Sequence, residues 1–411
     1  MCPIFPLHEK FFDFIDINKD KDVYSLKLSA PKSFSKEHLD FALIQIECRR
    51  AVKAKIPTFL KNHKFLFPSR ISAEQASHEA VARYHAELIG TGKKVADLTA
   101  GLGLDAMTMA LAGNHVTAFD VDEFKIEILR HNAKALGLLN LNAVHENSID
   151  YLASNPTFKA DIVYVDPARR DNKAKRVFRL DECEPDVVKN FELLKNAAIE
   201  KIIIKASPLL DLSMIIRQLP SCSEIHIVSV KGECKETLII IENGREKKPD
   251  EEVKICAVNI EGRDIIEKLD FYFSELNRPC PVVEIENIKP GTYIYDTNAG
   301  LHKLRIGGRL CEDFEGLRKL SLNSELYFSE YLYKDFPGRI FRIEKIIDYK
   351  RLKKGVLNNF EIISRNYPLS AENLRQELKI KGGSDEAFLI FTKVGTHEKK
   401  MIAISKKVFL E

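Results

Sequence analysis

The sequence predicts an α/β protein in which a mostly parallel β-sheet domain follows a helical region and precedes an α+β region. Three observations support this prediction. Residues 94–243 alternate short apolar runs with segments of helical periodicity. The last two apolar runs are joined by VKGECKE (residues 230–236), which is too short for a parallel crossover. Beyond the charged residues 242–252, the chain becomes rich in strand-like runs.

The length and charge of the chain indicate several domains and a basic C-terminal region. The chain has 411 residues, and a typical domain has roughly 100–200, so we expect two or three domains. Net charge is +3, but residues 331–411 hold 17 Lys and Arg against 10 Asp and Glu, which leaves −4 for the rest. This asymmetry points to a nucleic-acid partner, and a solvated charged surface is an equally weighted alternative.

The cysteines and the N-terminus bear on the cellular compartment. Eight cysteines are scattered along the chain without a CxxC pair, which fits neither a zinc site nor a disulfide framework. We therefore expect no metal and a reducing compartment. The N-terminus lacks the pattern of a signal peptide, and no apolar run reaches the about 18 residues of a membrane span. The sequence predicts a cytoplasmic protein with no membrane partner.

Residues 1–90 are predicted to form the helical region. Apolar residues recur at helical intervals between residues 36 and 63. The segment SAEQASHEAVARYHAELIG (residues 72–90) predicts one further helix, with Ser72 as its N-cap and Gln75 completing a capping box. Gly90 and Gly92 are expected to end that helix.

Residues 91–245 are predicted to form the sheet domain. Helices between the first six strands imply right-handed crossovers and parallel strands, whereas the seventh strand should run antiparallel. The predicted strands are 94–98, 115–119, 142–145, 161–165, 200–204, 224–230 and 236–241. The predicted helices are 103–112, 122–136, 148–154, 185–198 and 208–219. This is the strand pattern of the Rossmann-like, seven-stranded domain of class I methyltransferases, and plain dinucleotide-binding folds lack its terminal hairpin.

The C-terminal part is predicted to be α+β and to form two small units, residues 246–335 and 336–411. Its strand-like runs include VKICAVNI, LDFYFSEL, GTYIYD, GRIFRIEKII and EAFLIFTKV. Two short helices are expected at residues 312–320 and 370–378. The division between the two units is expected near residues 333–337.

The glycine turn VADLTAGLGLD (residues 95–105) predicts a cofactor site. Gly101 and Gly103 satisfy the G-x-G-x-x-G/A pattern and allow the backbone to approach a ligand. In a dinucleotide site, the residue four before the first glycine lies in a buried strand and should be apolar, but here it is Asp97. A buried carboxylate is costly unless it meets a positive group. The ammonium of S-adenosylmethionine supplies one, so this cofactor is favoured over a nicotinamide.

The other predicted cofactor contacts follow the ends of neighbouring strands. Asp120 closes the second strand and suits the two ribose hydroxyls. Asn147 and Ser148 follow the third strand, where the adenine amino group is usually held, although Ser148 fits equally well as a helix N-cap. The full predicted cofactor set is Asp97, Thr99, Ala100, Gly101, Gly103, Asp120, Val121, Asn147, Ser148 and Asp166.

The predicted catalytic residues are Asp166, Pro167, Ala168 and Arg169, at the end of the fourth strand. Because the sulfonium is already a strong methyl donor, the protein mainly has to align the attack and exclude water. An Asp at this edge accepts a hydrogen bond from an exocyclic or ring N–H of the target. A strand-ending turn is the structural alternative.

The basic segment RRDNKAKRVFR (residues 169–179) directly follows the predicted catalytic residues. Its charge would attract a phosphate backbone, so Arg170, Lys173 and Arg176 are predicted to bind substrate. An exposed charged loop without such a role is weighted equally. Cysteine-based methylation of a pyrimidine C5 is disfavoured, because no Cys lies at the Asp166 tip and Cys234 is the one candidate.

The motifs DLTAGLGLD, AFDVD and VDPARR, after a helix reading EQASHEAVARY, resemble class I S-adenosylmethionine-dependent methyltransferases. The most similar group is an uncharacterised bacterial one with a C-terminal THUMP-like domain, which the tail NNFEIISRNYPLSAENLRQELKIKGGSDEAFLIFTKV resembles. The segment before that tail resembles the small ferredoxin-like unit of the same group. Because THUMP-type modules accompany tRNA- and rRNA-modifying enzymes, the resemblance implies an RNA substrate.

One departure from the resemblance concerns the target. Amino-directed N-methyltransferases usually carry D/N-P-P-Y/F, and here the motif is Asp-Pro-Ala-Arg, so the aromatic that stacks on a base is missing. Phe178 or Tyr164 are the candidates to replace it. The sequence therefore predicts an RNA N-methyltransferase. The alternatives are a methyltransferase for a protein or small molecule, and a non-catalytic RNA-binding protein that keeps the fold.

Overall fold

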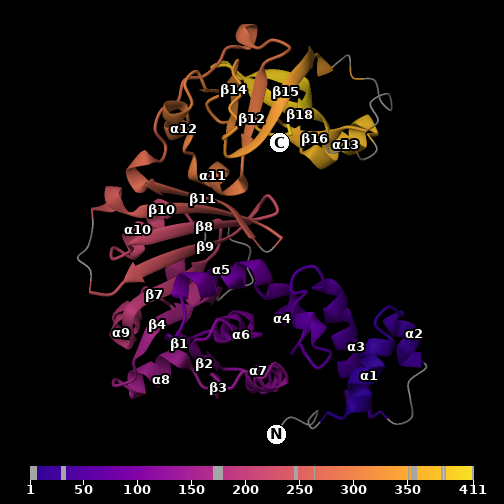
Figure 1. Cartoon of the computed structure of the whole chain (residues 1–411), viewed down its shortest axis with the longest axis vertical. Coiled ribbons are helices and arrows are strands. Elements are labelled where there is room, and N and C mark those ends of the chain that lie inside the picture. Colours follow the sequence, from indigo (N-terminus) through magenta and orange to yellow (C-terminus); the bar gives the residue numbers. More distant parts are fainter. Residues whose placement is uncertain are drawn as a thin grey trace. The chain divides into compact units, whose positions relative to one another are not determined.

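The computed structural model describes residues 7–28, 34–169, 179–244, 249–262, 264–349, 352, 359–380, 383 and 386–409. The chain divides into two compact units. The first comprises residues 1–230, 235–253 and 260–266, and the second comprises 231–234, 254–259 and 267–411. Each unit is described by itself below (Figure 1).

The described N-terminal residues are helical and share a core with the sheet domain. Phe11, Phe12, Ile46 and other apolar side chains of these helices cluster with Ile128 of helix α7 (Glu123–Ala135). The helices are α1 (Glu9–Ile17), α2 (Val23–Leu28), α3 (Lys36–Ala51), η1 (Phe59–Lys61), α4 (Arg70–Gln75) and α5 (Glu79–Ile89).

The single helix predicted over residues 72–90 is wrong, because the chain breaks between α4 and α5. Ser69, not Ser72, caps α4, since its side chain accepts from the Ser72 N–H at 3.1 Å. Ala76 then turns to extended backbone (ψ 149°), and α5 begins after a new N-cap at His78. The break directs Ser77 into the protein interior, where its hydroxyl contacts two charged side chains.

The first unit holds most of a nine-stranded sheet of order β11-β10-β8-β9-β7-β4-β1-β2-β3. Strands β3, β2, β1, β4 and β7 are parallel neighbours, and β9 runs antiparallel to β7. This confirms the predicted pattern of a parallel sheet with an antiparallel last strand. The bounds are β1 (Lys94–Asp97), β2 (His115–Asp120), β3 (Leu141–His145), β4 (Ala160–Val165), β7 (Ala198–Ala206), β8 (Glu224–Val230) and β9 (Glu233–Glu242).

Short helices connect these strands (Figure 1). They are α6 (Leu104–Leu111), α7, α8 (Ser148–Ser154), η2 (Leu180–Glu182), α9 (Phe191–Ala197) and α10 (Leu212–Gln218). A separate two-stranded ribbon, β5 (Ala168–Arg169) with β6 (Cys183–Glu184), follows β4. Strand β5 of this ribbon consists of the last two predicted catalytic residues, Ala168 and Arg169.

Two strands predicted to belong to the unit 246–335 instead extend the nine-stranded sheet. They are β10 (Lys254–Glu261) and β11 (Asp264–Tyr272), and they lie beyond β8. Consecutive residues of β10 are buried, so the strand is covered on both faces, whereas the edge strand β11 is largely exposed. The periodicity of a strand indicates that it is buried, but not which sheet buries it.

The second unit contains a seven-stranded sheet of order β13-β14-β12-β15-β18-β17-β16. It takes strands from both predicted C-terminal units, and Ile294, Phe341 and Met401 share one core, so the predicted division near residues 333–337 does not separate two sheets. The strands are β12 (Tyr293–Thr297), β13 (Arg318–Lys319), β14 (Leu326–Ser329), β15 (Gly338–Ile347), β16 (Glu361–Ser364), β17 (Ala387–Val394) and β18 (Lys399–Lys407).

The helices that follow β9 in the chain are short. They are η3 (Asp250–Glu252), just before β10, and η4 (Phe273–Glu275), η5 (Ile285–Asn287), α11 (Ala299–Leu304), α12 (Gly307–Asp313) and α13 (Ala371–Leu378). Helix α13 agrees with the prediction at residues 370–378. The helix predicted at 312–320 is wrong, because α12 ends at Asp313 and residues 318–319 form β13.

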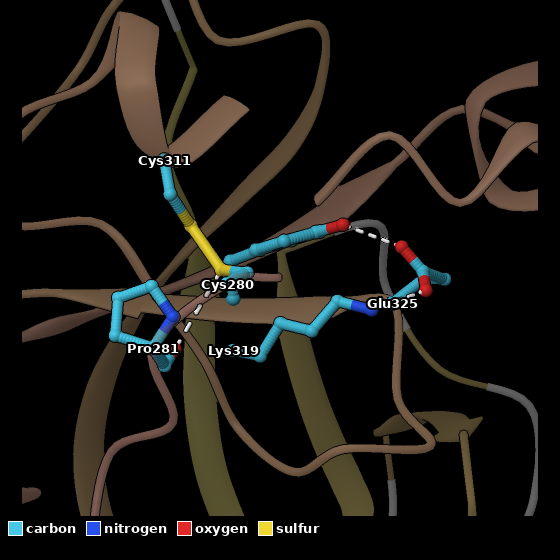
Figure 2. Close-up of a disulfide and its surroundings, with 6 residues drawn as sticks. Cys280, Pro281, Cys311, Lys319 and Glu325 are labelled. Atoms are coloured by element: carbon cyan, nitrogen blue, oxygen red, sulfur yellow. Dashed lines mark hydrogen bonds and ion pairs between the residues drawn. A yellow bond between two sulfur atoms is a disulfide. The ribbon is translucent and has the colours of Figure 1, made fainter. Parts of the chain in front are cut away.

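One disulfide joins Cys280 and Cys311 in the second unit, which corrects the expectation of isolated thiols (Figure 2). Nearby, Lys319 Nζ donates to Glu325 Oε1 at 2.6 Å, and the Tyr327 hydroxyl donates to the other oxygen of this carboxylate. The two cysteines are 31 residues apart in the sequence. No spacing motif marks such a pair, because the tertiary fold alone brings the two sulfurs together.

Candidate active site

The three acids predicted at strand ends meet at the carboxyl edge of the parallel sheet. Asp97 ends β1, Asp120 ends β2, and Asp166 directly follows β4. Strand β1 lies between the other two, with Asp97 in register with Ala118 and Tyr164. Ligands of open α/β sheets bind outside this edge, where the strand order reverses.

Asp97 is buried, with 1% of its surface exposed. Its Oδ1 accepts from the Thr99 N–H at 3.0 Å. Burial, together with the nearby carboxylates of Asp105, Asp166 and Asp120, raises the pKa of Asp97 to about 8, although the Thr99 hydrogen bond opposes this shift. A cation placed beside this carboxyl group would stabilise its ionised form.

The glycine turn is tied to both neighbouring strands through backbone groups. The Gly101 N–H donates to Asp120 Oδ2 at 3.0 Å, and the Asp122 N–H donates to Asp120 Oδ1 at 2.9 Å. The Ala100 N–H donates to the Phe119 carbonyl at 2.8 Å. These contacts fix the Asp120 carboxylate and use one lone pair of each oxygen, and Lys125 Nζ lies 3.7 Å from Oδ2.

The two glycines of the turn differ in what surrounds them. A Cβ at Gly101 (φ +57°) would meet nothing nearer than the Thr99 carbonyl at 4.0 Å, so open space adjoins this residue. A Cβ at Gly103 (φ +83°) would lie 2.2 Å from Leu129 Cδ1. Gly103 therefore allows the close packing of the turn against α7, and its place in the cofactor site stays a prediction.

The predicted adenine contacts also take distinct places. Asn147, not Ser148, is the N-cap of α8, because its Oδ1 accepts from the N–H groups of Ile149 and Asp150. Asn147 lines an open hollow together with Glu184 and Asp186, among others, whereas Ser148 is buried. Val121, directly after Asp120, is 66% exposed and offers an apolar surface.

Asp166 is held from its backbone and from its carboxylate. Its N–H donates to Thr99 Oγ1 at 2.7 Å, which links the glycine turn to the end of β4. Val165 pairs with Ile204 of the parallel strand β7, so the next residues, Asp166 and Lys205, lie side by side. Lys205 Nζ donates to Asp166 Oδ2 at 2.7 Å. The partly enclosed position of Asp166 raises its pKa, and Lys205 opposes that shift.

The rest of the predicted catalytic and substrate segment is only partly described. Pro167 leads into the β5–β6 ribbon, in which Ala168 pairs with Glu184 and Arg169 with Cys183. Arg170, Lys173, Arg176 and Phe178 lie outside the described residues. Tyr164, the other proposed aromatic replacement, is buried within β4 and does not face the edge as a stacking surface.

A cluster of buried charged side chains lies behind Asp166, and the sequence analysis missed it. His85 Nδ1 is 2.9 Å from Asp105 Oδ1 and 3.2 Å from the Tyr164 hydroxyl, and His85 Nε2 contacts Glu236 Oε1. Burial alone would lower the pKa of His85, but Glu236 and Asp105 outweigh it and raise that pKa to about 10. Both Asp105 and Lys205 remain charged, because their opposite partners shift their pKa values further into the ionised range.

Comparisons with known proteins agree with this architecture. Residues 338–406 match the family model described as a THUMP domain-like domain. The crystal structure of a candidate methyltransferase from Porphyromonas gingivalis W83 is 28% identical and superposes with a TM-score of 0.84, covering 98% of this chain and 100% of that chain. The chain therefore has a class I methyltransferase fold followed by a THUMP-like domain.

Two curated relatives match shorter stretches. An uncharacterised RNA methyltransferase of Mycoplasma mobile is 34% identical over 84 residues, covering 20% of this chain and 23% of that protein. The tRNA (uracil(54)-C(5))-methyltransferase of Pyrococcus abyssi is 34% identical over 114 residues, or 27% of each protein. The chain thus spans about a quarter of the length of the curated relatives it matches.

Two further findings concern membranes and metals. In the described ranges, no helix is both long and apolar enough to cross a membrane. No cluster of three or more His, Cys, Asp or Glu side chains suited to a metal ion occurs among the residues that the structure describes.

Proposed function

We propose that this protein is an S-adenosylmethionine-dependent methyltransferase that modifies a base nitrogen of tRNA or rRNA. The observation that carries the proposal is the buried carboxyl group of Asp97 at the ligand-binding edge of a class I methyltransferase sheet. A carboxyl group with a pKa near 8 in that position is costly to ionise unless a cation binds beside it. The ammonium of the methionine part of the cofactor is such a cation.

The residues present fit this cofactor. Asp97 would bind the ammonium, and Asp120 would bind the ribose hydroxyls. The exposed Val121 side chain would pack against the adenine, and Asn147 lies beyond the neighbouring strand β3. When bound, the cofactor supplies a methyl group activated by a sulfonium. Thr99, Ala100 and Gly101 hold the backbone of the turn in place for it.

Asp166 is proposed to orient the nucleotide. The Asp166 side chain is 39% exposed, although it pairs with the largely buried Lys205. Its backbone N–H is bound to Thr99 of the glycine turn. Its carboxylate accepts a hydrogen bond from an N–H of the target, which positions the nitrogen and raises its electron density. Ala168 leaves room beside it, where related motifs carry bulkier residues.

An RNA substrate is supported by the C-terminal unit and by the relatives. Residues 331–411 carry a surplus of seven positive charges, which suits contact with a phosphate backbone. The THUMP-like match falls within this stretch, and both curated relatives are named as RNA methyltransferases. We infer that this domain docks the RNA. Arg170, Lys173 and Arg176 remain proposed contacts near the reacting base.

Methylation of a pyrimidine C5 is a second candidate reaction. The Pyrococcus relative is named for that reaction, and Cys183 of β6 pairs with Arg169 across the ribbon that follows Asp166. Its thiol lies 3.4 Å from the Arg179 carbonyl. Cys183 is therefore a second candidate nucleophile beside Cys234, the candidate from the sequence. Replacement of Cys183 by Ser separates the two reactions, because only the C5 route requires this thiol.

The test uses RNA from a strain that lacks the gene. Full-length protein is incubated with its tRNA and rRNA and a radiolabelled methyl donor, and the nucleosides are then separated by mass spectrometry. The proposal expects a methylated base that wild-type cells contain and the deletion strain lacks. Incorporation of label into protein would instead favour a protein substrate. No incorporation, together with normal binding of the donor, would favour a non-catalytic role.

A further inference from the structure

Lys205 is a largely buried cation behind the proposed active site. Only 14% of its side chain is exposed. Its ammonium lies 2.7 Å from Asp166 Oδ2, 3.0 Å from Ser77 Oγ and 3.9 Å from Glu236 Oε2. Two hydrogen bonds and one longer ion pair therefore hold the ammonium from three sides.

The acceptors of Lys205 are themselves held by one another. Ser77 Oγ donates to Asp105 Oδ2 at 2.6 Å, and Asp105 Oδ1 pairs with His85 at 2.9 Å. His85 contacts Glu236, and Glu236 returns to Lys205. The five side chains form a closed ring, which we call the buried charge ring. They come from the α4–α5 break, α5, α6, β7 and β9.

Asp166 is attached to the buried charge ring through one oxygen. Lys205 occupies Oδ2, while Asp166 itself is 39% exposed at the sheet edge. Lys205 thus connects the ring to the accessible Asp166 carboxylate and fixes its orientation. Such an arrangement costs more desolvation than an ordinary surface ion pair, which points to a role beyond stability.

We propose that Lys205 is a positioning residue that holds Oδ2 of Asp166 and leaves Oδ1 as the acceptor for the target N–H. This rests on the proposed function and deepens it by naming the group that orients the catalytic carboxylate. Without the Lys205 cation, His85 would still face the carboxyl groups of Asp105 and Glu236, but the Asp166 carboxyl group would lose its positive partner. Asp166 would then hold a proton more tightly and become a donor where an acceptor is needed.

The consequence for pH follows from the sign of that change. Loss of the Lys205 charge raises the pKa of Asp166, so activity that needs the ionised carboxylate disappears at a higher pH on the acid side. The other titratable groups that act on this pair come from every element around it. They are Asp97, Tyr164, Asp105, Glu236 and Lys55, and His85 lies behind Asp105 and Glu236.

The experiment compares full-length wild type with Lys205→Met, Lys205→Arg and Ser77→Ala. Lys201→Met is the matched control, because Lys201 is on the same strand and donates to the Leu88 carbonyl away from the ring. Turnover of methyl groups onto RNA from the deletion strain is measured across pH, with the KM for the donor. Circular dichroism checks that each variant folds.

We expect Lys205→Met to lower kcat about ten- to a hundredfold at neutral pH with little change in the donor KM. The pH at which its activity falls on the acid side of the profile should rise by about one unit or more, because a neighbouring charge shifts a carboxyl pKa by that much. Lys205→Arg keeps the positive charge, so its activity on the acid side of the profile should be close to that of wild type. Ser77→Ala should shift in the same direction by less, and Lys201→Met should match wild type.

A folded Lys205→Met protein with wild-type kcat and pH profile would overturn the positioning role while leaving the proposed function intact. If Lys205→Met does not fold, Ser77→Ala decides, and a wild-type pH profile with unchanged kcat in that folded variant would overturn the role. A wild-type protein that transfers no methyl group to any RNA would overturn the proposed function and this inference with it.

Discussion

Two buried carboxyl groups, one in each unit, behave in opposite ways. Asp97 of β1 and Asp296 of β12 are each 1% exposed. The pKa of Asp97 rises to about 8 through burial, whereas Asp296 has a pKa of about 2 despite its burial. Burial alone therefore does not decide whether an acid is charged, and the neighbours do.

The neighbours of Asp296 are a histidine and two arginines. His302 Nε2 is 3.7 Å from Oδ1, Arg365 Nε is 3.6 Å from the same oxygen, and the Arg339 guanidinium donates to Oδ2. The Asp296 carboxylate is thus neutralised within its own domain. Asp97 instead faces other carboxyl groups, so the protein leaves its positive partner to be supplied by a ligand. In this account, Asp296 stabilises the fold, whereas Asp97 binds the ammonium of the cofactor.

The largest effect should follow Asp97→Asn. The amide keeps the shape of the side chain but removes the charge that pairs with the ammonium, so S-adenosylmethionine should bind about a hundredfold more weakly. Isothermal titration calorimetry measures this affinity. Asp296→Asn is the control and should bind the cofactor normally. Equal affinity for wild type and Asp97→Asn would remove Asp97 from the cofactor site.

Asp296→Asn should instead lower the free energy of unfolding by about 2 kcal/mol, because a buried carboxylate with charged hydrogen-bond partners is lost. Urea unfolding followed by circular dichroism gives this value. Asp97→Asn should cost far less in the same experiment without ligand. A comparable loss of unfolding free energy in both variants would show that both acids stabilise the fold, which would contradict the distinction between them.

The two acids should also give opposite dependences of stability on pH. The folded pKa of Asp97 lies above the 3.8 of an ordinary Asp, so its contribution is lost as pH rises toward about 8. The folded pKa of Asp296 lies below 3.8, so its contribution is lost as pH falls toward about 2. Unfolding of wild type against each Asn variant, across pH without ligand, should show these slopes. Parallel slopes for the two variants would contradict the assignment.

The smallest effect is expected at the arginines that pair with Asp296. The side chains of Arg339 and Arg365 are each 42% exposed, so water takes over much of the interaction when one is replaced. Arg365→Met should therefore cost less than about 1 kcal/mol of unfolding free energy, measured by urea unfolding. A loss as large as that of Asp296→Asn would mean that this single ion pair carries the charge compensation.

The sheet edge was predictable from sequence because it depends on local patterns. Parallel strands that alternate with helices place their carboxyl ends together, so Asp97, Asp120 and Asp166 were assigned to one edge from residue spacing alone. The helix break at Ala76 was not predictable in this way. It follows from a polar contact of Ser77 with residues of α6 and β7, and the helical periodicity of the segment continues through it.

The buried charge ring was missed because it joins residues far apart in the chain. His85 and Glu236 are 151 positions apart, and no local pattern relates them. A weak indication existed in Lys205, a charged residue at the end of the apolar run of β7. The same limit hid the disulfide and the sheet to which β10 and β11 belong, since both depend on tertiary contacts.

The most direct test counts the protons released when the cofactor binds. Calorimetric titration of the full-length protein with S-adenosylmethionine, repeated near pH 7 in buffers of different ionisation enthalpy, measures that number. Because free Asp97 with a pKa of about 8 is mostly protonated there, pairing with the ammonium should release close to one proton. Asp97→Asn should release none. Binding of the cofactor to wild type without proton release would contradict the account of Asp97.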